Sequence, residues 1–122
     1  MKLEEMLRPG GKGVMATASK TGEVNTAVYA VPEVADDGTV AWGMTDGRTW
    51  DNVSQNPRAA YIYFAAGDGF RGARLTLSLL RTEDSGEMLA KIRERTAAVS
   101  PGDPESVRHV AYFRVVETRP LV

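Results

Sequence analysis

The stretch VAWGMTDGRTWDNVSQNPRAAYIYF, residues 40–64, places a short helix between two strands and decides how the rest of the chain is interpreted. Residues 39–45 alternate in the manner of a strand. Asp46 and Gly47 suit a helix entry, and Asn56 followed by proline is a firm stop, so the helix is expected from about Arg48 to Gln55. After the proline, four consecutive apolar or aromatic residues at 61–64 predict a strand covered on both faces.

The chain on either side of this stretch is rich in strands with turns between them. The period-two patterns and turn residues predict a helix at 2–7, strands at 13–22, 23–32, 73–82 and 109–117, and a helix at 86–99. Strands and helices do not alternate regularly, so the strand pairs should be antiparallel. Six strands in one domain, 1–122, favour a mainly β fold, a small closed or partly open barrel with peripheral helices.

Composition narrows the choice of function. The chain has 122 residues, with 15 Lys and Arg against 16 Asp and Glu, and a pI near 5.8. Nucleic-acid binding normally requires a basic excess, so no nucleic-acid partner is expected. The basic run at 91–95 is interpreted as the solvated face of a helix. A chain of this size buries a modest core, which favours a homodimer.

The N-terminal residues 1–11 contain four charged side chains and no continuous apolar stretch. They predict neither a signal peptide nor a membrane anchor, so no membrane association is expected and the cytoplasm is the expected compartment.

Catalytic and metal-binding side chains are scarce in this sequence. It contains no cysteine and a single histidine, His109, which is interpreted as structural or as a surface residue because no nucleophile motif accompanies it. The acidic residues at 35–38 have the composition of a turn, and the glycine-rich segment 67–72 is interpreted as a hairpin connection. No catalytic residue and no metal site are therefore predicted, and any reaction would depend on a bound cofactor.

The start of the helix at 48–55 is the best candidate for holding an anionic cofactor. A helix N-terminus offers unpaired N–H groups, to which Arg48 adds a guanidinium, Thr49 a hydroxyl and Asn52 an amide on the same face. The preceding strand would bring Gly43 and Thr45 beside this phosphate cradle and leave space for a flat ring. The alternative is a plain connector, with Arg48 paired to Asp51, Thr49 in the first turn, and Trp50 and Val53 in the core.

The order of elements resembles that of a known family. VNTAVYAV from Val24, the stretch 40–64 and the closing FRVVETRPL from Phe113 are similar to the FMN-binding split-barrel family, the relatives of pyridoxamine 5'-phosphate oxidase. The resemblance extends over nearly all of the chain from Gly13 onward and is strongest to the small FMN-binding proteins. It implies a six-stranded antiparallel Greek-key split barrel that forms a homodimer with FMN at the interface.

The resemblance also implies roles for particular residues. The phosphate contacts fall on Arg48 and Thr49, with Asn52 supporting the loop. Family members often have lysine in place of Arg48, and either cation binds phosphate. The residues expected to border the flavin ring are Asn25, Thr26, Ala27, Met44 and Thr45. Tyr29, Trp42, Leu121 and Val122 are further candidates to cover the ring, although core packing is the favoured role for each.

The function expected from the resemblance is that of an FMN flavoprotein, either an oxidoreductase or an electron carrier with a small-molecule or protein redox partner. The chain lacks the C-terminal substrate motif of the oxidase, so pyridoxine-phosphate chemistry is not expected. Two alternatives stay open: a non-enzymatic electron-transfer protein, and a flavin-free barrel that binds haem, a deazaflavin or a protein partner.

Overall fold

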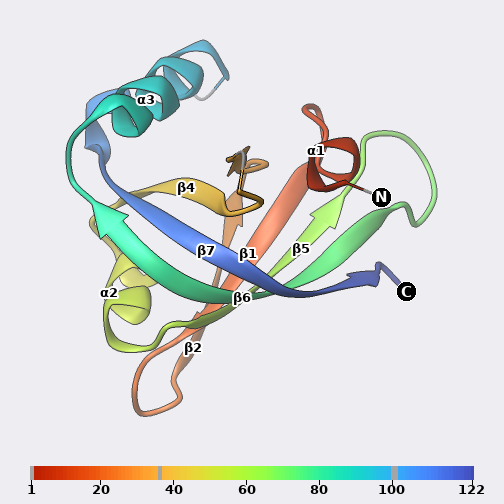
Figure 1. Ribbon diagram of the computed structural model, residues 1–122, viewed down its shortest axis with the longest axis horizontal. Coiled ribbons are helices and arrows are strands. Elements are labelled where there is room, and N and C mark those ends of the chain that lie inside the picture. The colour runs from red at the N-terminus through yellow and green to blue at the C-terminus, as the bar shows by residue number, and fades with distance from the viewer. Residues whose placement is uncertain (1, 36, 100–101) are drawn as a thin grey trace.

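The computed structural model describes residues 2–35, 37–99 and 102–122 (Figure 1). Antiparallel strands are the main regular structure, and the helices are short except for the one near the C-terminus. In chain order the elements are α1 (Leu3–Met6), β1 (Lys12–Ala18), β2 (Val24–Tyr29), β3 (Glu33–Val34), β4 (Val40–Thr45), α2 (Arg48–Gln55), β5 (Arg58–Phe64), β6 (Gly72–Glu83), α3 (Glu87–Val99), a 3-10 turn (Pro104–Ser106) and β7 (Val107–Pro120).

The described strands form one curled antiparallel sheet in the order β2-β1-β5-β6-β7-β4-β3. The expected mainly β, antiparallel class is correct, but the sheet has seven strands and the expected six is wrong by one. The additional strand, β3, is two residues long and pairs Glu33 with Ala41. Two residues cannot show a period-two pattern, so this strand could not be predicted from the sequence.

Strand β5 alternates between the two faces of the sheet, which contradicts the expectation that both its faces are covered. Tyr61 and Tyr63 point into the core and are each 1% exposed, whereas Ile62 and Phe64 lie on the outer face. The outward residues are themselves apolar, so the sequence did not show an alternation of apolar and polar residues. The glycine-rich loop joins β5 to β6 as a hairpin, as predicted, with the Ala65 N–H donating to the Arg71 carbonyl at 2.8 Å.

The core is built around the aromatic residues Trp42, Tyr61 and Phe113. The ring centroids of Trp42 and Tyr61 are 4.7 Å apart, and those of Trp42 and Phe113 are 5.7 Å apart. The indole Nε1–H of Trp42 donates to the carbonyl of Ala30 at 2.8 Å, and the Tyr61 hydroxyl lies 3.1 Å from the same oxygen. Strand β2 pairs only with β1 among the described strands, so these side chains connect its far end to β4 and β5.

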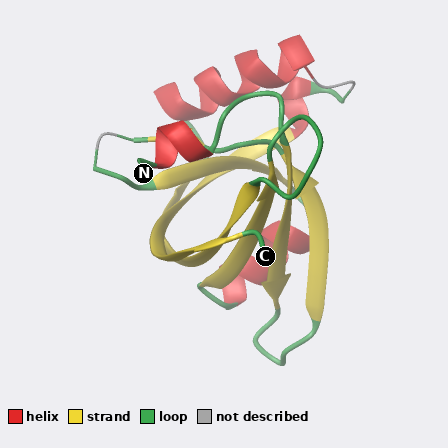
Figure 2. Ribbon diagram, turned by 90° about the vertical axis from the view of Figure 1, so that its right-hand side faces the viewer, coloured by secondary structure: helices red, strands yellow, loops and turns green. Residues whose placement is uncertain are grey.

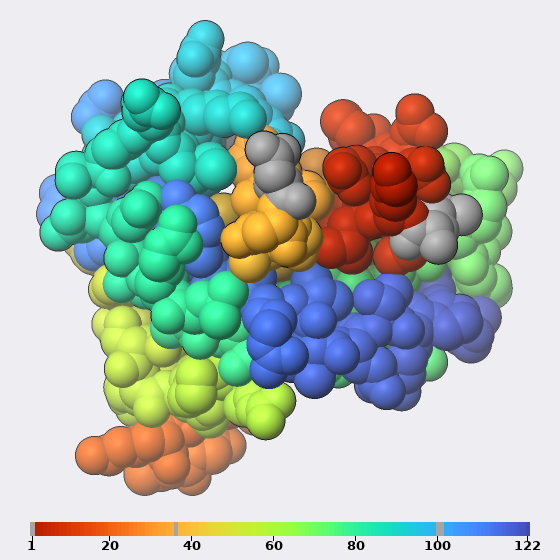
Figure 3. Space-filling model, viewed as in Figure 1, coloured from red at the N-terminus to blue at the C-terminus, as the bar shows by residue number. Residues whose placement is uncertain are grey.

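The helices lie at the ends of the curled sheet. Helices α1 and α3 are on its upper side in Figure 2, and α2 is at the lower end, where it contacts β1, β2 and β4. The β1–β2 hairpin, in orange, projects from the lower edge of the molecule (Figure 3). Among the described residues, no helix combines the length and the apolar character needed to cross a membrane.

We expect Tyr61→Phe to lower the free energy of unfolding by about 1–2 kcal/mol, because it removes a buried hydroxyl that bonds the end of β2. Urea unfolding would measure the loss, and hydrogen exchange should become faster at the amides near Tyr29 and Ala30. Tyr63→Phe is the matched control, since its hydroxyl bonds the Arg8 carbonyl at 2.6 Å instead. Faster exchange in β2 of the control, or unchanged exchange in Tyr61→Phe, would contradict this role.

Candidate functional site

A groove of about 630 Å³ lies between β2, β4, the start of α2 and α3. It is bounded by the edge strand β2 on one side and by α3 on the other. Six of the eight residues that the sequence predicted for cofactor binding line it: Asn25, Thr26, Ala27, Thr45, Arg48 and Thr49. Folding therefore brings residues from separate parts of the chain together around a single space.

The first turn of α2 faces this groove with unsatisfied donors. The helix is capped by Gly47, which has no side chain to accept from the first N–H groups. Arg48 is exposed and forms no ion pair with any residue that the structure describes, so the alternative pairing with Asp51 is not observed. A free guanidinium beside uncapped N–H groups is suited to binding an oxyanion.

Thr49 is buried at the base of the groove and joins α2 to β2. Its Oγ1 accepts a hydrogen bond from Asn25 Nδ2 at 3.4 Å. Tyr29 lines the same groove; burial raises the pKa of its hydroxyl, and the neighbouring Thr49 side chain offsets the rise only in part. Tyr29 therefore keeps its proton at neutral pH and can act as a donor.

Two predicted site residues, Met44 and Asn52, do not line the groove. Met44 is 1% exposed and packs in the core. Asn52 is buried beneath α2, where its Nδ2 donates to Thr17 Oγ1 on β1 at 3.1 Å. This bond ties α2 to the sheet. Val53 packs in the core, as the connector interpretation proposed. Helix α2 therefore both packs on the core and forms one wall of the groove.

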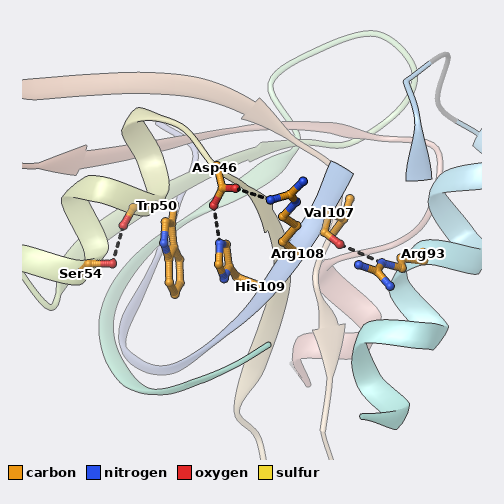
Figure 4. Close-up of polar contacts among 7 residues, drawn as sticks. All are labelled: Asp46, Trp50, Ser54, Arg93, Val107, Arg108 and His109. Carbon is orange, nitrogen blue, oxygen red and sulfur yellow. Dashed lines mark hydrogen bonds and ion pairs between the residues drawn. The ribbon is translucent and has the colours of Figure 1, made fainter. Parts of the chain in front are cut away.

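The residue before the helix cap, Asp46, is held by two residues of β7 (Figure 4). Its Oδ1 lies 2.6 Å from His109 Nε2, and its Oδ2 lies 3.3 Å from Arg108. The His109 ring stacks on Trp50 of α2, with centroids 3.8 Å apart and planes at 1°. The hydrogen bond from His109 lowers the pKa of Asp46, and the charges of His109 and Arg108 add to this.

A β-bulge makes this arrangement possible. The register of β4 against β7 shifts between Met44, which pairs with His109, and Thr45, which pairs with Val107. Arg108 is the additional residue, so Arg108 and His109 both reach Asp46 although successive strand residues normally point to opposite faces. The prediction that His109 is structural agrees with this position.

The α3 side of the groove was not predicted from the sequence. It is formed by Ile92, Arg95, Thr96 and Val99, together with Gly102, Asp103, Ser106 and Val107. A Cβ at Gly43 would lie 2.6 Å from Ile92 and 2.7 Å from Val107. The small residue at this position therefore allows the close approach of α3 and β7, while Gly43 itself lines the groove.

The basic run 91–95 in α3 was expected to be only the solvated face of a helix, but the structure shows specific contacts for it. Arg95 lines the groove and forms an ion pair with Glu33, whose other oxygen lies 3.3 Å from Lys91. Burial raises the pKa of Glu33, but its bonds to Arg95 and Lys91 outweigh burial and hold that pKa below its usual value. Arg93 Nε donates to the Val107 carbonyl at 2.8 Å (Figure 4). The sequence did not predict these contacts, because the partner residues lie far apart in the chain.

Comparison by sequence finds no matching family model and no matching curated protein. Solved structures do match. An FMN-binding protein from Syntrophomonas wolfei subsp. wolfei is 19% identical, with a TM-score of 0.76 over 90% of this chain and 76% of that one. HupZ from Group A Streptococcus is 18% identical, with a TM-score of 0.78 over 99% and 94% of the two chains. An F420 reductase is 19% identical, with a TM-score of 0.68 over 95% and 94%.

The fold is thus that of a curled antiparallel barrel with a ligand-sized groove beside its edge strand. More particularly, it is the split-barrel fold of flavin-binding proteins, and the resemblance seen in the sequence is confirmed at the level of the fold. Identities below a fifth support this fold and leave the ligand to be argued from the groove itself.

We expect Asp46→Asn to lower the free energy of unfolding at neutral pH. The difference from the wild-type protein should become smaller in acid. Folding lowers the pKa of Asp46, so its contribution is fully present above the unfolded value of about 3.9 and is lost as the pH falls through the folded pKa. Urea unfolding of both proteins from pH 7 to pH 3 measures the difference. Asp51→Asn on the same helix is the control. A gap as large at pH 3 as at pH 7 would refute the assignment.

Proposed function

We propose that the chain binds FMN in the groove between β2 and β4, with the phosphate at the first turn of α2. The observation that carries the proposal is the exposed guanidinium of Arg48, which has no ion-pair partner among the described residues, beside a helix N-terminus with no side-chain cap in the same part of the chain. The matched FMN-binding protein of the same fold supports it.

The groups present fit a mononucleotide. The α2 end of the groove offers the Arg48 guanidinium, backbone N–H groups and the Thr49 hydroxyl, which are the donors that a phosphate accepts from. The remaining walls are formed by β2, by Ala41 and Trp42 of β4, and by α3 with the segment that follows it. Mostly apolar walls with a few convergent polar groups are typical of cofactor sites of this volume.

Flavin would supply the redox chemistry, and the chain would supply binding and electrostatics. Backbone amides of β2 would hydrogen-bond the ring, as proposed for Asn25, Thr26 and Ala27. Of the four side chains considered as ring covers, Trp42 and Leu121 are buried and Val122 is 84% exposed at the C-terminus. Tyr29, whose side chain belongs to the groove, is the best placed of them.

We further propose that a second copy of the chain completes the groove. The groove follows β2, which is an edge strand among the described strands, and that strand exposes Val24 and Val28 at 83% and 76%. An unprotected apolar edge is normally covered by a partner. A homodimer would cover this edge and enclose the ring.

Turnover and electron transfer are distinguished by assay. An oxidoreductase would oxidise NADH or NADPH, whereas a carrier would be yellow and show negligible turnover. The matched F420 reductase makes F420 a second ligand to test. The visible spectrum of the purified protein, alone and after adding FMN or F420, would distinguish bound FMN from F420 and from haem, and a barrel that binds none of these chromophores would be colourless.

We expect Arg48→Ala to weaken FMN binding about 10- to 150-fold, the effect of losing a charge-assisted contact of about 1.5–3 kcal/mol. Arg48→Lys should retain most of the affinity because the cation is kept. Titration followed by flavin fluorescence measures both. Arg58→Ala, at an exposed arginine outside the groove, is the control. Unchanged FMN affinity in Arg48→Ala would reject the phosphate cradle.

We expect the protein to sediment as a dimer in analytical ultracentrifugation, and Val24→Asp to shift it toward the monomer by placing a charge on the apolar edge. Val116→Asp, at an exposed valine of β7, should leave the sedimentation unchanged. A monomeric wild-type protein, or equal dissociation in both variants, would rule out this interface.

A further inference from the structure

We propose that Glu33 is a positioning residue: its ion pairs with Arg95 and Lys91 hold the second half of α3, residues 93–99, as a wall of the groove and thereby slow the release of a planar ligand. The inference rests on the proposed binding of FMN in this groove. It concerns the wall formed by α3 and gives a role to the ion pairs of that helix, which the proposed function does not use.

The second half of α3 contributes to the groove but not to the core. The buried residues of this helix are Leu89 and Ile92, and both lie in its first half. Residues 93–99 are half-buried or exposed, yet three of them line the groove: Arg95, Thr96 and Val99. Packing of an apolar face is what normally holds a helix in place, so this half of α3 depends on its polar contacts instead.

Glu33 lies on the face of the sheet that α3 covers. It pairs with Ala41 of β4, and residues that pair directly across two strands point to the same face. Ala41 belongs to the same apolar cluster as Leu89 and Ile92 of α3. The Glu33 side chain is 13% exposed and also lines the groove. Its carboxylate therefore lies where β3, α3 and the groove meet.

Two cations of α3 converge on this carboxylate. Lys91 and Arg95 are four residues apart, so they lie on the same side of the helix. Arg95 pairs with one carboxylate oxygen of Glu33, and the Lys91 Nζ lies 3.3 Å from the other. Burial raises the pKa of Glu33, but the bonds from Arg95 and Lys91 lower it by more, so the group is charged at neutral pH. Both of its oxygens are thus bound to the helix.

The other polar contacts of this half connect it to a different part of the fold. The Arg93 guanidinium lies 3.6 Å from Glu105, whose side chain is 78% exposed, and exposed ion pairs contribute little. Arg93 Nε also donates to the Val107 carbonyl at 2.8 Å, at the start of β7. Among the described residues, Glu33 is the one that links α3 by ion pairs to β3, the strand that follows the groove-lining strand β2.

The consequence for a ligand follows from the apolar surface of this wall. Val99 lines the groove and is 79% exposed. A flat ring in the groove would cover Val99 only while residues 93–99 stay in place, and covering apolar surface favours binding. Loss of the Glu33 ion pairs should therefore shorten the lifetime of the complex, with a much smaller effect on how fast the complex forms.

The test is Glu33→Gln, which keeps the shape of the side chain and removes its charge. In the protein alone, hydrogen exchange at the amides of residues 93–99 should become about 5- to 10-fold faster, and exchange at 87–92 should be unchanged because Leu89 and Ile92 still pack. Stopped-flow fluorescence should show FMN dissociating about 5- to 10-fold faster and associating within about twofold of the wild-type rate. Glu33→Asp, which keeps the charge, should recover most of the loss.

Glu105→Gln is the matched control. It makes the same change at the exposed partner of Arg93 on the same helix, and it should alter neither the exchange nor the release of FMN. The double variant Glu33→Gln with Arg95→Gln should release FMN no faster than the faster of the two single variants, because both substitutions remove the same contact.

The outcomes separate this inference from the proposed function. If the wild-type protein fails to bind FMN, the proposed function is wrong, and the exchange measurement still tests the position of α3. Unchanged exchange at residues 93–99 in Glu33→Gln would reject the positioning role. Tighter FMN binding in that variant would also reject it, since Glu33 would then compete with the ligand for Arg95. Additive effects in the double variant would reject it as well, because Arg95 would then act on the ligand directly.

Discussion

The two hydrogen bonds received by the carbonyl of Ala30 are the constraint on which the groove depends. A curled sheet that ends on β2 leaves that strand with a single paired neighbour among the described strands. Trp42 and Tyr61, from two other strands, reach across the core and bond this one oxygen. Burial raises the pKa of Tyr61, so its hydroxyl remains a donor throughout the physiological range. Without these bonds β2 would not be held at a fixed distance from β4, and the space between them would not have a defined shape.

The groove is bounded at one end by α2 and on the other side by α3. Helix α2 is fixed to β1 by the bond from Asn52 to Thr17 and to β7 by the stack of Trp50 on His109. These contacts leave its first turn facing the groove. On the other side, Ile92 lies close against Gly43, so α3 forms the opposite wall of the groove. A ligand held at the α2 end is thereby directed along β2.

Charge around the first turn of α2 is arranged so that an anion can approach. Asp46 lies two residues before Arg48 and would repel a phosphate, but it is paired with His109 and Arg108, so its field is largely cancelled. Arg48 keeps its charge free of such pairing within the part of the chain that the structure describes. The net charge of the whole chain is close to zero, so affinity for an anion has to come from this local asymmetry and not from a general field.

The sequence by itself determined the elements whose causes are local. Period-two alternation predicted the long strands, and Gly47 with Asn56-Pro57 predicted the bounds of α2, because turn and cap chemistry acts over a few residues. The sequence also identified Arg48 and Thr49 as candidate binding residues. Only the tertiary structure decided that Met44 faces the core, that α3 packs close against Gly43, and that a bulge at Arg108 directs two neighbouring residues to Asp46. Each of these depends on strand register and on contacts between residues far apart in the chain, where one residue of shift reverses which face a side chain occupies.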